Sequence, residues 1–254
     1  THLTEEAEAV GLSRVAPLRG VRAERALSAS LDVGRRLGVF DVNATLFAAS
    51  ISNALAAVPA EPQGFLRGAP KAGGAIYALI NQVDPARTWG SEVRVRYERE
   101  RLHVTGTYNY TRATESAFEC LRRTAVEAEL GFACQERSRR EVPRTALHAA
   151  GAMAGWEDDN LGRVGADLYY VGRQELEDDP FRPLSRGYVV FGVLVERRLG
   201  GARVFLNGQN LLDARQTRWS PLVRTDRSLQ GRWTTDVWAP LEGRVLNAGV
   251  RFSL

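Results

Sequence analysis

The last nine residues of the chain, LNAGVRFSL, alternate strictly between two classes of side chain. Leu246, Ala248, Val250, Phe252 and Leu254 fall on one parity, and asparagine, glycine, arginine and serine fall on the other. Successive side chains of a strand point to opposite faces, so this pattern predicts one apolar and one polar face. Free chain ends usually fray in water. The ending therefore suits the closing strand of a barrel, with the parity of Leu246 toward lipid and the other toward the lumen.

The same alternation recurs through most of the chain and predicts further strands. A first hairpin turns at RRLG, and a second, with a heavily charged polar face, turns near Glu100. Predicted strands cover residues 26–34, 40–48, 89–98, 102–111, 142–156, 163–170, 188–196, 203–213 and 246–254. We therefore expect about nine strands.

The connections between these strands alternate in length. Short turns are predicted near Gly38, Glu100, Asp159 and Gly200, and long loops at 53–73, 115–141, 174–186 and 214–240. In an up-and-down meander all short turns then lie at one end, which is typical of transmembrane barrels. Alternating strands also build soluble sandwiches, and the pattern alone leaves that alternative open. The favoured fold class is all-β, an antiparallel up-and-down transmembrane β-barrel, present here in part.

Composition and charge exclude some classes of protein but do not identify the function. The longest apolar run, near residues 189–195, is far shorter than a membrane helix requires. The net charge of +4 comes from arginines spread along the chain, so no nucleic-acid partner is expected. The first residues, THLTEEAEAVGL, do not form a signal peptide, and we expect the chain to begin in mid-protein.

Two stretches near the end, RVFLNGQNLLDARQTR and VWAPLEGRVLNAGVRFSL, resemble the C-terminal part of TonB-dependent outer-membrane receptors. The first carries that family's Asn-Leu-x-Asp at the top of the penultimate strand, and the second its Pro-x-x-Gly-Arg before the last strand. The matching residues are Asn210, Leu211, Asp213, Pro240, Leu241, Gly243 and Arg244. The terminal alternation looks like the signal read by the barrel assembly machinery, although this chain ends in Leu254 where the family usually ends in Phe or Trp. The hairpins around TLFAASI and TWGSEVRVRYER are also similar.

The resemblance implies a 22-stranded barrel around an N-terminal plug that engages TonB. Nine strands are too few, and neither plug nor TonB box is found here, so residues 1–254 are interpreted as the C-terminal portion of such a barrel, without the plug and first strands. The implied setting is the bacterial outer membrane, with lipid, lipopolysaccharide and the TonB system as partners. The implied role is uptake of a small, scarce nutrient complex, most often an iron siderophore, with haem, cobalamin and oligosaccharides as alternatives. A passive porin-like or structural barrel segment is the second hypothesis.

Cys120 and Cys134 would close a loop of about fifteen residues. A disulfide there would contribute roughly 3 kcal/mol in the loop-entropy model, and an oxidising surface favours it. Free thiols and half of a metal site are the alternatives, but no histidine lies near in sequence.

The long loops offer three further candidate sites. Arginines of the cysteine loop could bind an anionic ligand or lipopolysaccharide phosphates, or simply be solvated. They are Arg122, Arg123, Arg137, Arg139 and Arg140. An acidic run, Glu175, Glu177, Asp178 and Asp179, could hold a cation but lacks EF-hand spacing, and a solvated loop fits it better. Trp89, Tyr108, Tyr110 and Tyr170 fit an aromatic girdle better than a ligand platform.

No enzymatic role is expected. The chain has no Gly-x-Ser-x-Gly elbow, phosphate loop or zinc-binding helix motif, and only three histidines. His103, on a predicted polar face, is better explained as a lumen residue than as a general base. We therefore predict no cofactor, no metal site and no catalytic residue, with a barrel hydrolase as a remote alternative.

Overall fold

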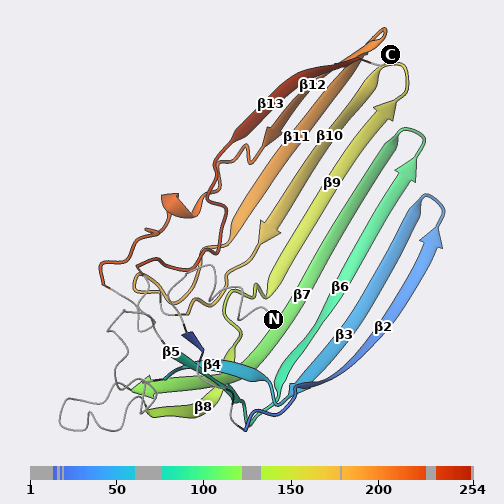
Figure 1. The fold of residues 1–254 in the computed structure, drawn as a ribbon. Coiled ribbons are helices and arrows are strands. Elements are labelled where there is room, and N and C mark those ends of the chain that lie inside the picture. Colours follow the sequence, from blue (N-terminus) through green and yellow to red (C-terminus); the bar gives the residue numbers. More distant parts are fainter. Residues whose placement is uncertain are drawn as a thin grey trace.

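The computed structural model describes residues 14–15, 18, 20–60, 76–121, 133–177, 179–226 and 233–252. Its main sheet runs in the order β13-β12-β11-β10-β9-β7-β6-β3-β2, and every neighbouring pair is antiparallel (Figure 1). The strands are β2 (Arg25–Leu37), β3 (Phe40–Ser52), β6 (Ala86–Arg99), β7 (Leu102–Leu121), β9 (His148–Asp158), β10 (Gly162–Val171), β11 (Tyr188–Leu199), β12 (Ala202–Gln209) and β13 (Val245–Phe252). This confirms the predicted all-β, up-and-down antiparallel fold. The nine predicted strands correspond to these nine, and the described residues form four further strands, β1 (Arg14–Val15), β4 (Leu55–Ala60), β5 (Ile76–Asn81) and β8 (Ala133–Glu141).

Short and long connections lie at opposite ends of this sheet, as predicted (Figure 1). The tight turns follow β2, β6, β9 and β11, and the long connections lie at the other end. Gly38 and Gly200 have φ angles of 62° and 61°, a left-handed conformation that glycine adopts without steric cost. We refer to the two ends as the turn end and the loop end.

Several segments predicted as loops form strands instead. β7 continues to Leu121 and pairs with β8 (Ala133–Glu141), so the loop prediction for residues 115–141 was wrong at both of its ends. β4 (Leu55–Ala60) and β5 (Ile76–Asn81) form a separate three-stranded sheet with β1 (Arg14–Val15). Charged residues stand on both parities of β8, so its sequence shows no period-two alternation.

Two predicted strands have different bounds. The strand predicted at 142–156 begins only at His148, since residues 143–144 form a turn in which Arg144 has a φ of 61°. The strand predicted at 203–213 ends at Gln209, because Asn210 and Asp213 both adopt positive φ angles. Left-handed backbone cannot continue a strand.

The register gives the main sheet one apolar and one polar face. Directly paired residues share a face, and pairs such as Val204 with Val250 and Val42 with Val95 continue the apolar face from strand to strand. Its side chains are uncovered, with exposed fractions of 69% for Leu246, 72% for Phe252 and 78% for Leu27. A soluble sandwich would bury this face against a second sheet. Exposure of the whole apolar face suits a sheet that meets lipid.

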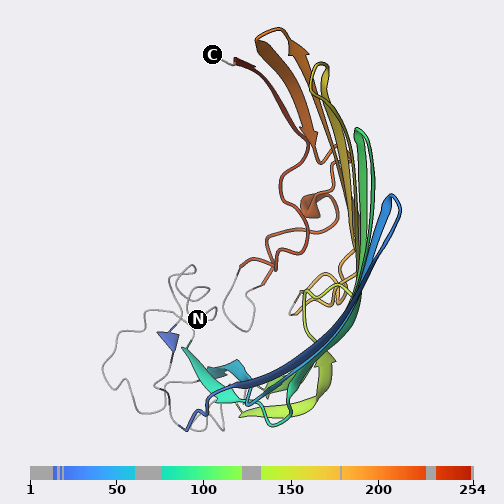
Figure 2. The same cartoon turned by 90° about the vertical axis from the view of Figure 1, so that its right-hand side faces the viewer.

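Buried apolar residues are few and lie mainly at the loop end. Among the described residues they are Ala54, Val58, Ala113, Ala214, Trp238 and Ala239. β2 and β13 form the two edges of the described sheet and do not pair with each other. Figure 2 shows the sheet in profile as a curved wall, with the segment between β12 and β13 on its concave side. Among the described residues no helix has the length and apolar character needed to cross a bilayer, an observation that does not bear on strands.

Candidate functional site

The polar face of the sheet carries charged and amide side chains that bond to one another across strands. Asp32 accepts hydrogen bonds from the Asn43 amide at 2.8 Å and the Thr45 hydroxyl at 2.6 Å. Farther along, Arg94 on β6 pairs with Asp41 on β3 at 4.0 Å, and Arg96 pairs with Glu98 within β6 at 2.5 Å. Such groups are costly in hydrocarbon. This face therefore suits the interior of a barrel, where water or other polar groups can contact it.

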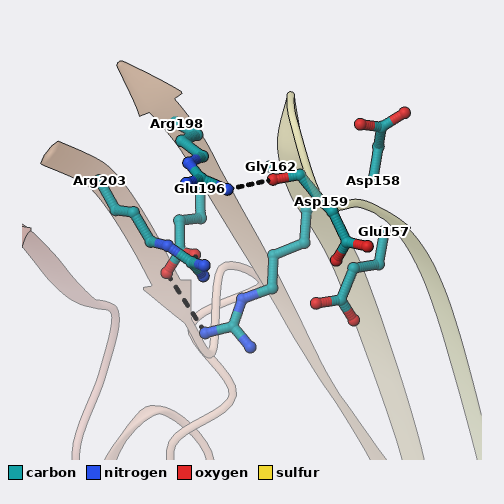
Figure 3. Close-up of a pocket in the computed structure, with 8 residues that line it drawn as sticks. Glu157, Asp158, Asp159, Gly162, Glu196, Arg198 and Arg203 are labelled. Carbon is teal, nitrogen blue, oxygen red and sulfur yellow. Dashed lines mark hydrogen bonds and ion pairs between the residues drawn. The ribbon is translucent and has the colours of Figure 1, made fainter. Parts of the chain in front are cut away.

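Glu196 is the most enclosed charged group of this face. Its side chain lies between two guanidinium groups, with Arg163 at 3.3 Å and Arg203 at 3.2 Å, on the two neighbouring strands (Figure 3). Only 4% of Glu196 is exposed, so its charge depends on these partners. One carboxylate thus joins β10, β11 and β12 near the turn end. The arrangement braces the wall of the sheet, and its charges are already paired.

Asp158 makes a comparable connection between two tight turns. Its carboxylate accepts hydrogen bonds from the backbone N–H groups of Asn160 and Leu161, at 2.8 and 3.0 Å. It also pairs with Arg101, in the turn between β6 and β7, at 2.5 Å. The turn end is therefore held by side chains as well as by the backbone ladder.

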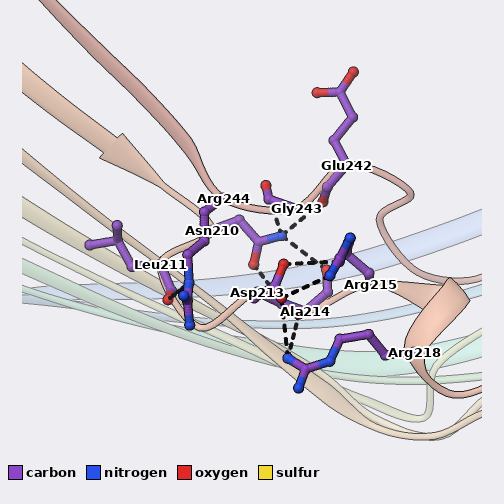
Figure 4. A network of polar contacts seen from close by, with 9 residues as sticks. All are labelled: Asn210, Leu211, Asp213, Ala214, Arg215, Arg218, Glu242, Gly243 and Arg244. Carbon is purple, nitrogen blue, oxygen red and sulfur yellow. Dashed lines mark hydrogen bonds and ion pairs between the residues drawn. The ribbon is translucent and has the colours of Figure 1, made fainter.

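The residues of the Asn-Leu-x-Asp motif meet those of the Pro-x-x-Gly-Arg motif at the loop end (Figure 4). The Asn210 amide donates to the carbonyl oxygens of Ala214 and Glu242, both at 3.0 Å, while its Oδ1 accepts from the Ala214 N–H at 2.9 Å. Arg244 Nε donates to the Leu211 carbonyl oxygen at 2.8 Å. These bonds join the end of β12 to the start of β13. We call this set of contacts the Asn210 clamp.

Asp213 completes the clamp on its other side. Its carboxylate pairs with Arg215 at 2.9 Å and with Arg218 at 3.3 Å. Gly243 lies against it, since a Cβ at that position would come within 2.6 Å of Asp213 Oδ1. The carboxylate of Asp213 in the first motif therefore requires a glycine at position 243 in the second motif.

Gln216 organises the long connection between β12 and β13. It is fully buried, and its Oε1 accepts hydrogen bonds from the backbone N–H groups of Trp238 and Ala239, at 2.8 and 3.3 Å. Its Nε2 donates to the Asp236 carbonyl oxygen at 2.8 Å. The backbone N–H of Gln216 donates to the carbonyl oxygen of Pro240, also at 2.8 Å. One side chain therefore fixes both arms of the connection together.

Aromatic and cationic side chains gather beside this connection. Trp219 stacks on Trp238 with ring centroids 5.9 Å apart, and on Tyr188 at 6.3 Å. The guanidinium group of Arg182 lies 5.8 Å from the centroid of the Trp238 ring, and that of Arg186 lies 5.8 Å from the centroid of the Trp219 ring. Trp238 is only 4% exposed and serves packing, whereas Trp219 is partly exposed and Arg186 is exposed. Trp219 and Arg186 thus present a cationic aromatic surface at the loop end.

The arginines predicted as a ligand loop are only partly described. Arg122 and Arg123 lie outside the described residues, as does the side chain of Arg137. Arg140 pairs with Glu115 at 2.9 Å and with Glu177 at 2.8 Å, and Arg139 donates to the Pro85 carbonyl oxygen. Burial raises the pKa of Glu115, an effect that the nearby Arg140 opposes. Arg139 and Arg140 could bind an anion only by leaving these partners.

The two cysteines occupy directly opposed positions. Cys120 on β7 pairs in register with Cys134 on β8, one pair from the far end of the hairpin. Their side chains lie outside the described ones, so the disulfide stays a prediction. In the acidic run, Asp178 is outside the described residues, Glu177 bonds to Arg140, and Asp179 Oδ1 accepts from the Phe181 N–H at 2.8 Å. Within the described ranges no group of three metal-ligating residues occurs.

The four aromatic residues singled out in the sequence lie on the apolar face. Trp89, Tyr108 and Tyr110 follow its parity on β6 and β7, and Tyr170 lies in the row of Tyr108 through Ala150. Trp89 and Tyr110 are in contact, with centroids 5.5 Å apart. They point away from the polar face, which favours the girdle over the ligand platform.

The profile of a known family, "TonB dependent receptor-like, beta-barrel", matches residues 21–211 of this chain. The chain belongs to the TonB-dependent receptor family. No curated protein sequence matches the chain. The clamp at 210–244 extends beyond the matched range only in its later residues.

Solved structures of iron and copper transporters and of a ferric enterobactin receptor share this fold. The FrpB iron transporter from Neisseria meningitidis matches with a TM-score of 0.56 and 17% identity, over 93% of this chain and 32% of its own. The ferric enterobactin receptor PfeA from Pseudomonas aeruginosa matches with a TM-score of 0.56 and 17% identity, over 91% and 31%. The copper transporter OprC gives 0.59 and 13%, over 95% and 34%. The chain thus spans about a third of the length of these proteins.

The first family motif begins directly after β12, which ends at Gln209, and the second ends directly before β13. Sequence reasoning missed the side chains that act with these motifs. Gln216 and Trp219 fall in a stretch predicted only as a loop, and no local pattern marks either one. Glu196 lies within a predicted strand, but its two arginine partners become apparent only from the strand register. Leu246, Ala248, Val250 and Phe252 of the predicted assembly signal lie on exposed edge strand β13, and Leu254 is outside the described residues.

Proposed function

We propose that this chain forms the C-terminal wall and outer loops of a TonB-dependent outer-membrane receptor that takes up a scarce nutrient complex. The observation that carries the proposal is the division of one continuous sheet into an exposed apolar face and a polar face with paired charges. The apolar face contacts lipid and the polar face lines the lumen. The loop end lies outside the cell and the turn end faces the periplasm.

The remainder of the barrel and the plug lie in the rest of the full protein. β2 and β13 each present one unpaired edge among the described strands, and such edges need partners in a membrane. We propose that β13 pairs with the first strand of the complete barrel and that a plug domain contacts TonB. Barrel assembly machinery would read the apolar parity of β13.

In this proposal, residues at the loop end bind the ligand. Trp219 and Arg186 offer stacking and positive charge together, which suits an anionic complex that contains flat, conjugated groups. An iron siderophore meets that description. FrpB is an iron transporter, PfeA is a ferric enterobactin receptor and OprC is a copper transporter, so the substrate test includes both metals.

The deciding experiment measures uptake in cells. The gene of the full protein is deleted and restored in strains with and without TonB, and accumulation of radioactive ferric enterobactin, ferric citrate and copper(II) is followed. We expect one of these probes, or another siderophore complex in an extended panel, to accumulate only when receptor and TonB are both present. Accumulation that depends on the receptor but not on TonB would instead support a passive pore, and no dependence on the receptor for any probe would refute uptake.

A further inference from the structure

Two arginines lie on the apolar face at its loop end. Arg112 is paired in register with Trp89, and Arg87 with Thr114, so both share the face of Trp89 and Tyr110. Arg87 also pairs with Ser50, which in turn faces Leu27 on the same side. Both arginine side chains are exposed. They therefore point outward, away from the polar face.

These positions follow an ordered change in side-chain character along the strands. On this face of β6, Val95 and Val93 lie toward the turn end, Ser91 and then Trp89 follow, and Arg87 lies beyond Trp89. On β7, Tyr108 and Tyr110 precede Arg112 in the same direction. Aliphatic, aromatic and cationic side chains in that order match the hydrocarbon, the interface and the headgroups of a bilayer. The two guanidinium groups thus lie at the depth of lipid phosphates.

The two arginines also lie close to each other in the sheet. They form a diagonal cross-strand pair, for which Cα separations are about 7–8 Å, and like charges so placed repel. Arg112 bonds to Glu141 at 2.8 Å, whereas Arg87 makes no ion pair within the described ranges. The Arg112 side chain is 49% exposed, so another anion can reach its guanidinium group beside Glu141, whose side chain is 26% exposed.

Neighbouring groups add polar contacts just below. Tyr108 Oη lies 2.7 Å from His148 Nδ1, and the His148 ring lies 5.4 Å from that of Tyr110. Glu141 on β8 is paired in register with Thr114 on β7, so its carboxylate lies on the same face as Arg112. Among the described residues the patch thus offers the guanidinium groups of Arg87 and Arg112, the Glu141 carboxylate, and hydroxyl and imidazole groups beneath them, while Arg139, on the same face beside Ser116, donates to Pro85.

We propose that Arg87 and Arg112 bind the phosphate groups of lipopolysaccharide in the outer leaflet. Guanidinium groups bind phosphate through paired hydrogen bonds, and the phosphate relieves their mutual repulsion. The proposal rests on the outer-membrane location of the proposed function. It assigns lipid recognition to the outer face of β6 and β7 rather than to the arginines of the β7–β8 loop.

The test uses the full protein purified in detergent and fluorescently labelled lipopolysaccharide as the probe. The R87Q/R112Q variant is compared with R94Q/R96Q, which removes two arginines from the polar face of the same strand β6. At about 1 kcal/mol per interfacial arginine, we expect R87Q/R112Q to bind roughly 10- to 30-fold more weakly. R94Q/R96Q should bind as the wild type does. Dephosphorylated lipopolysaccharide should bind the wild type as weakly as intact lipopolysaccharide binds R87Q/R112Q.

Three results would overturn the proposal. They are unchanged binding by R87Q/R112Q, an equal loss in R94Q/R96Q, and full displacement of the probe by millimolar inorganic phosphate, which would indicate a site for small anions only. The R87K/R112K variant guards against misfolding, since it keeps both charges and should retain most binding. Nutrient uptake is measured separately. Lipopolysaccharide binding without TonB-dependent uptake would refute the proposed function alone, and the reverse result would refute this inference alone.

Discussion

The side-chain amide of Asn210 lies 3.0 Å from the backbone carbonyl oxygen of Glu242, 32 residues later in the chain. Through this bond the end of β12 fixes the position from which β13 starts. Asn210 has a φ of 49°, a left-handed conformation that asparagine tolerates better than most residues. Both the conformation and the hydrogen bonds therefore favour asparagine at this position.

Replacing Asn210 should separate these two contributions. N210A loses the amide bonds and places alanine in left-handed backbone, so the free energy of unfolding of the full protein should fall by about 2–3 kcal/mol. N210G keeps the backbone conformation and should lose less. Urea unfolding in micelles measures both, with N247A on the exposed polar face of β13 as the control. Equal stability of N210A and N247A would show that the clamp contributes nothing.

Two glycines in neighbouring strands give a matched test of the sheet packing. A Cβ at Gly90 would come within 2.1 Å of the Tyr110 carbonyl oxygen and 2.7 Å of Phe47 Cζ, whereas a Cβ at Gly106 meets nothing within 4 Å. G90A should therefore destabilise the protein by about 1–3 kcal/mol, and G106A should change it by less than about 0.5 kcal/mol. The migration of unheated samples on denaturing gels reports the folded fraction. Similar loss of the folded form in both variants would contradict this account.

The register of Cys120 and Cys134 sharpens the disulfide prediction. Directly opposed strand positions bring Cα atoms to about 4.5–5.5 Å, within the range that a disulfide spans. We propose that the bond forms and ties the far end of the β7–β8 hairpin. Thiol titration of the denatured full protein should find no reactive thiol before reduction and two after it. Two titratable thiols without reductant would disprove the bond.

Glu115 should make the β7–β8 hairpin sensitive to pH. It lies on the part of β7 that pairs with β8, beyond the rows shared with β9, and burial raises its pKa above the ordinary value of 4.5. A raised carboxyl pKa means that the protonated form is favoured in the folded state. Its contribution to stability is therefore complete below pH 4.5 and is lost as pH rises through the folded pKa.

The neutral substitution E115Q tests this sign. At neutral pH, amides of β7 and β8 in E115Q should exchange with deuterium no faster than in the wild type, although the pair with Arg140 is lost. The two proteins should converge below pH 4.5. Faster exchange in E115Q at neutral pH would show that the attraction of Arg140 outweighs the cost of burial.

Period-two alternation was sufficient to predict the strands of the barrel wall and insufficient to predict β8. β6 and β7 alternate visibly because one face of the main sheet is apolar and the other is polar. β8, ACQERSRRE, carries charges on both parities and was therefore interpreted as a loop. The family motifs fixed the place of Asn210 and Gly243, whereas Gln216 looks like any polar loop residue until Trp238 and Pro240 are brought beside it.

The cross-linked connection between β12 and β13 bears on how the last strand reaches its place. Closing an unstructured loop of this length costs about 3 kcal/mol in chain entropy beyond a constant. Gln216 shortens the free chain by joining its two arms, so part of that cost is offset by bonds made within the loop itself. β13 is then already held close to β12 when the two strands pair. During biogenesis the exposed edge of β12 is covered sooner, and the time in which another chain could pair with it is shorter.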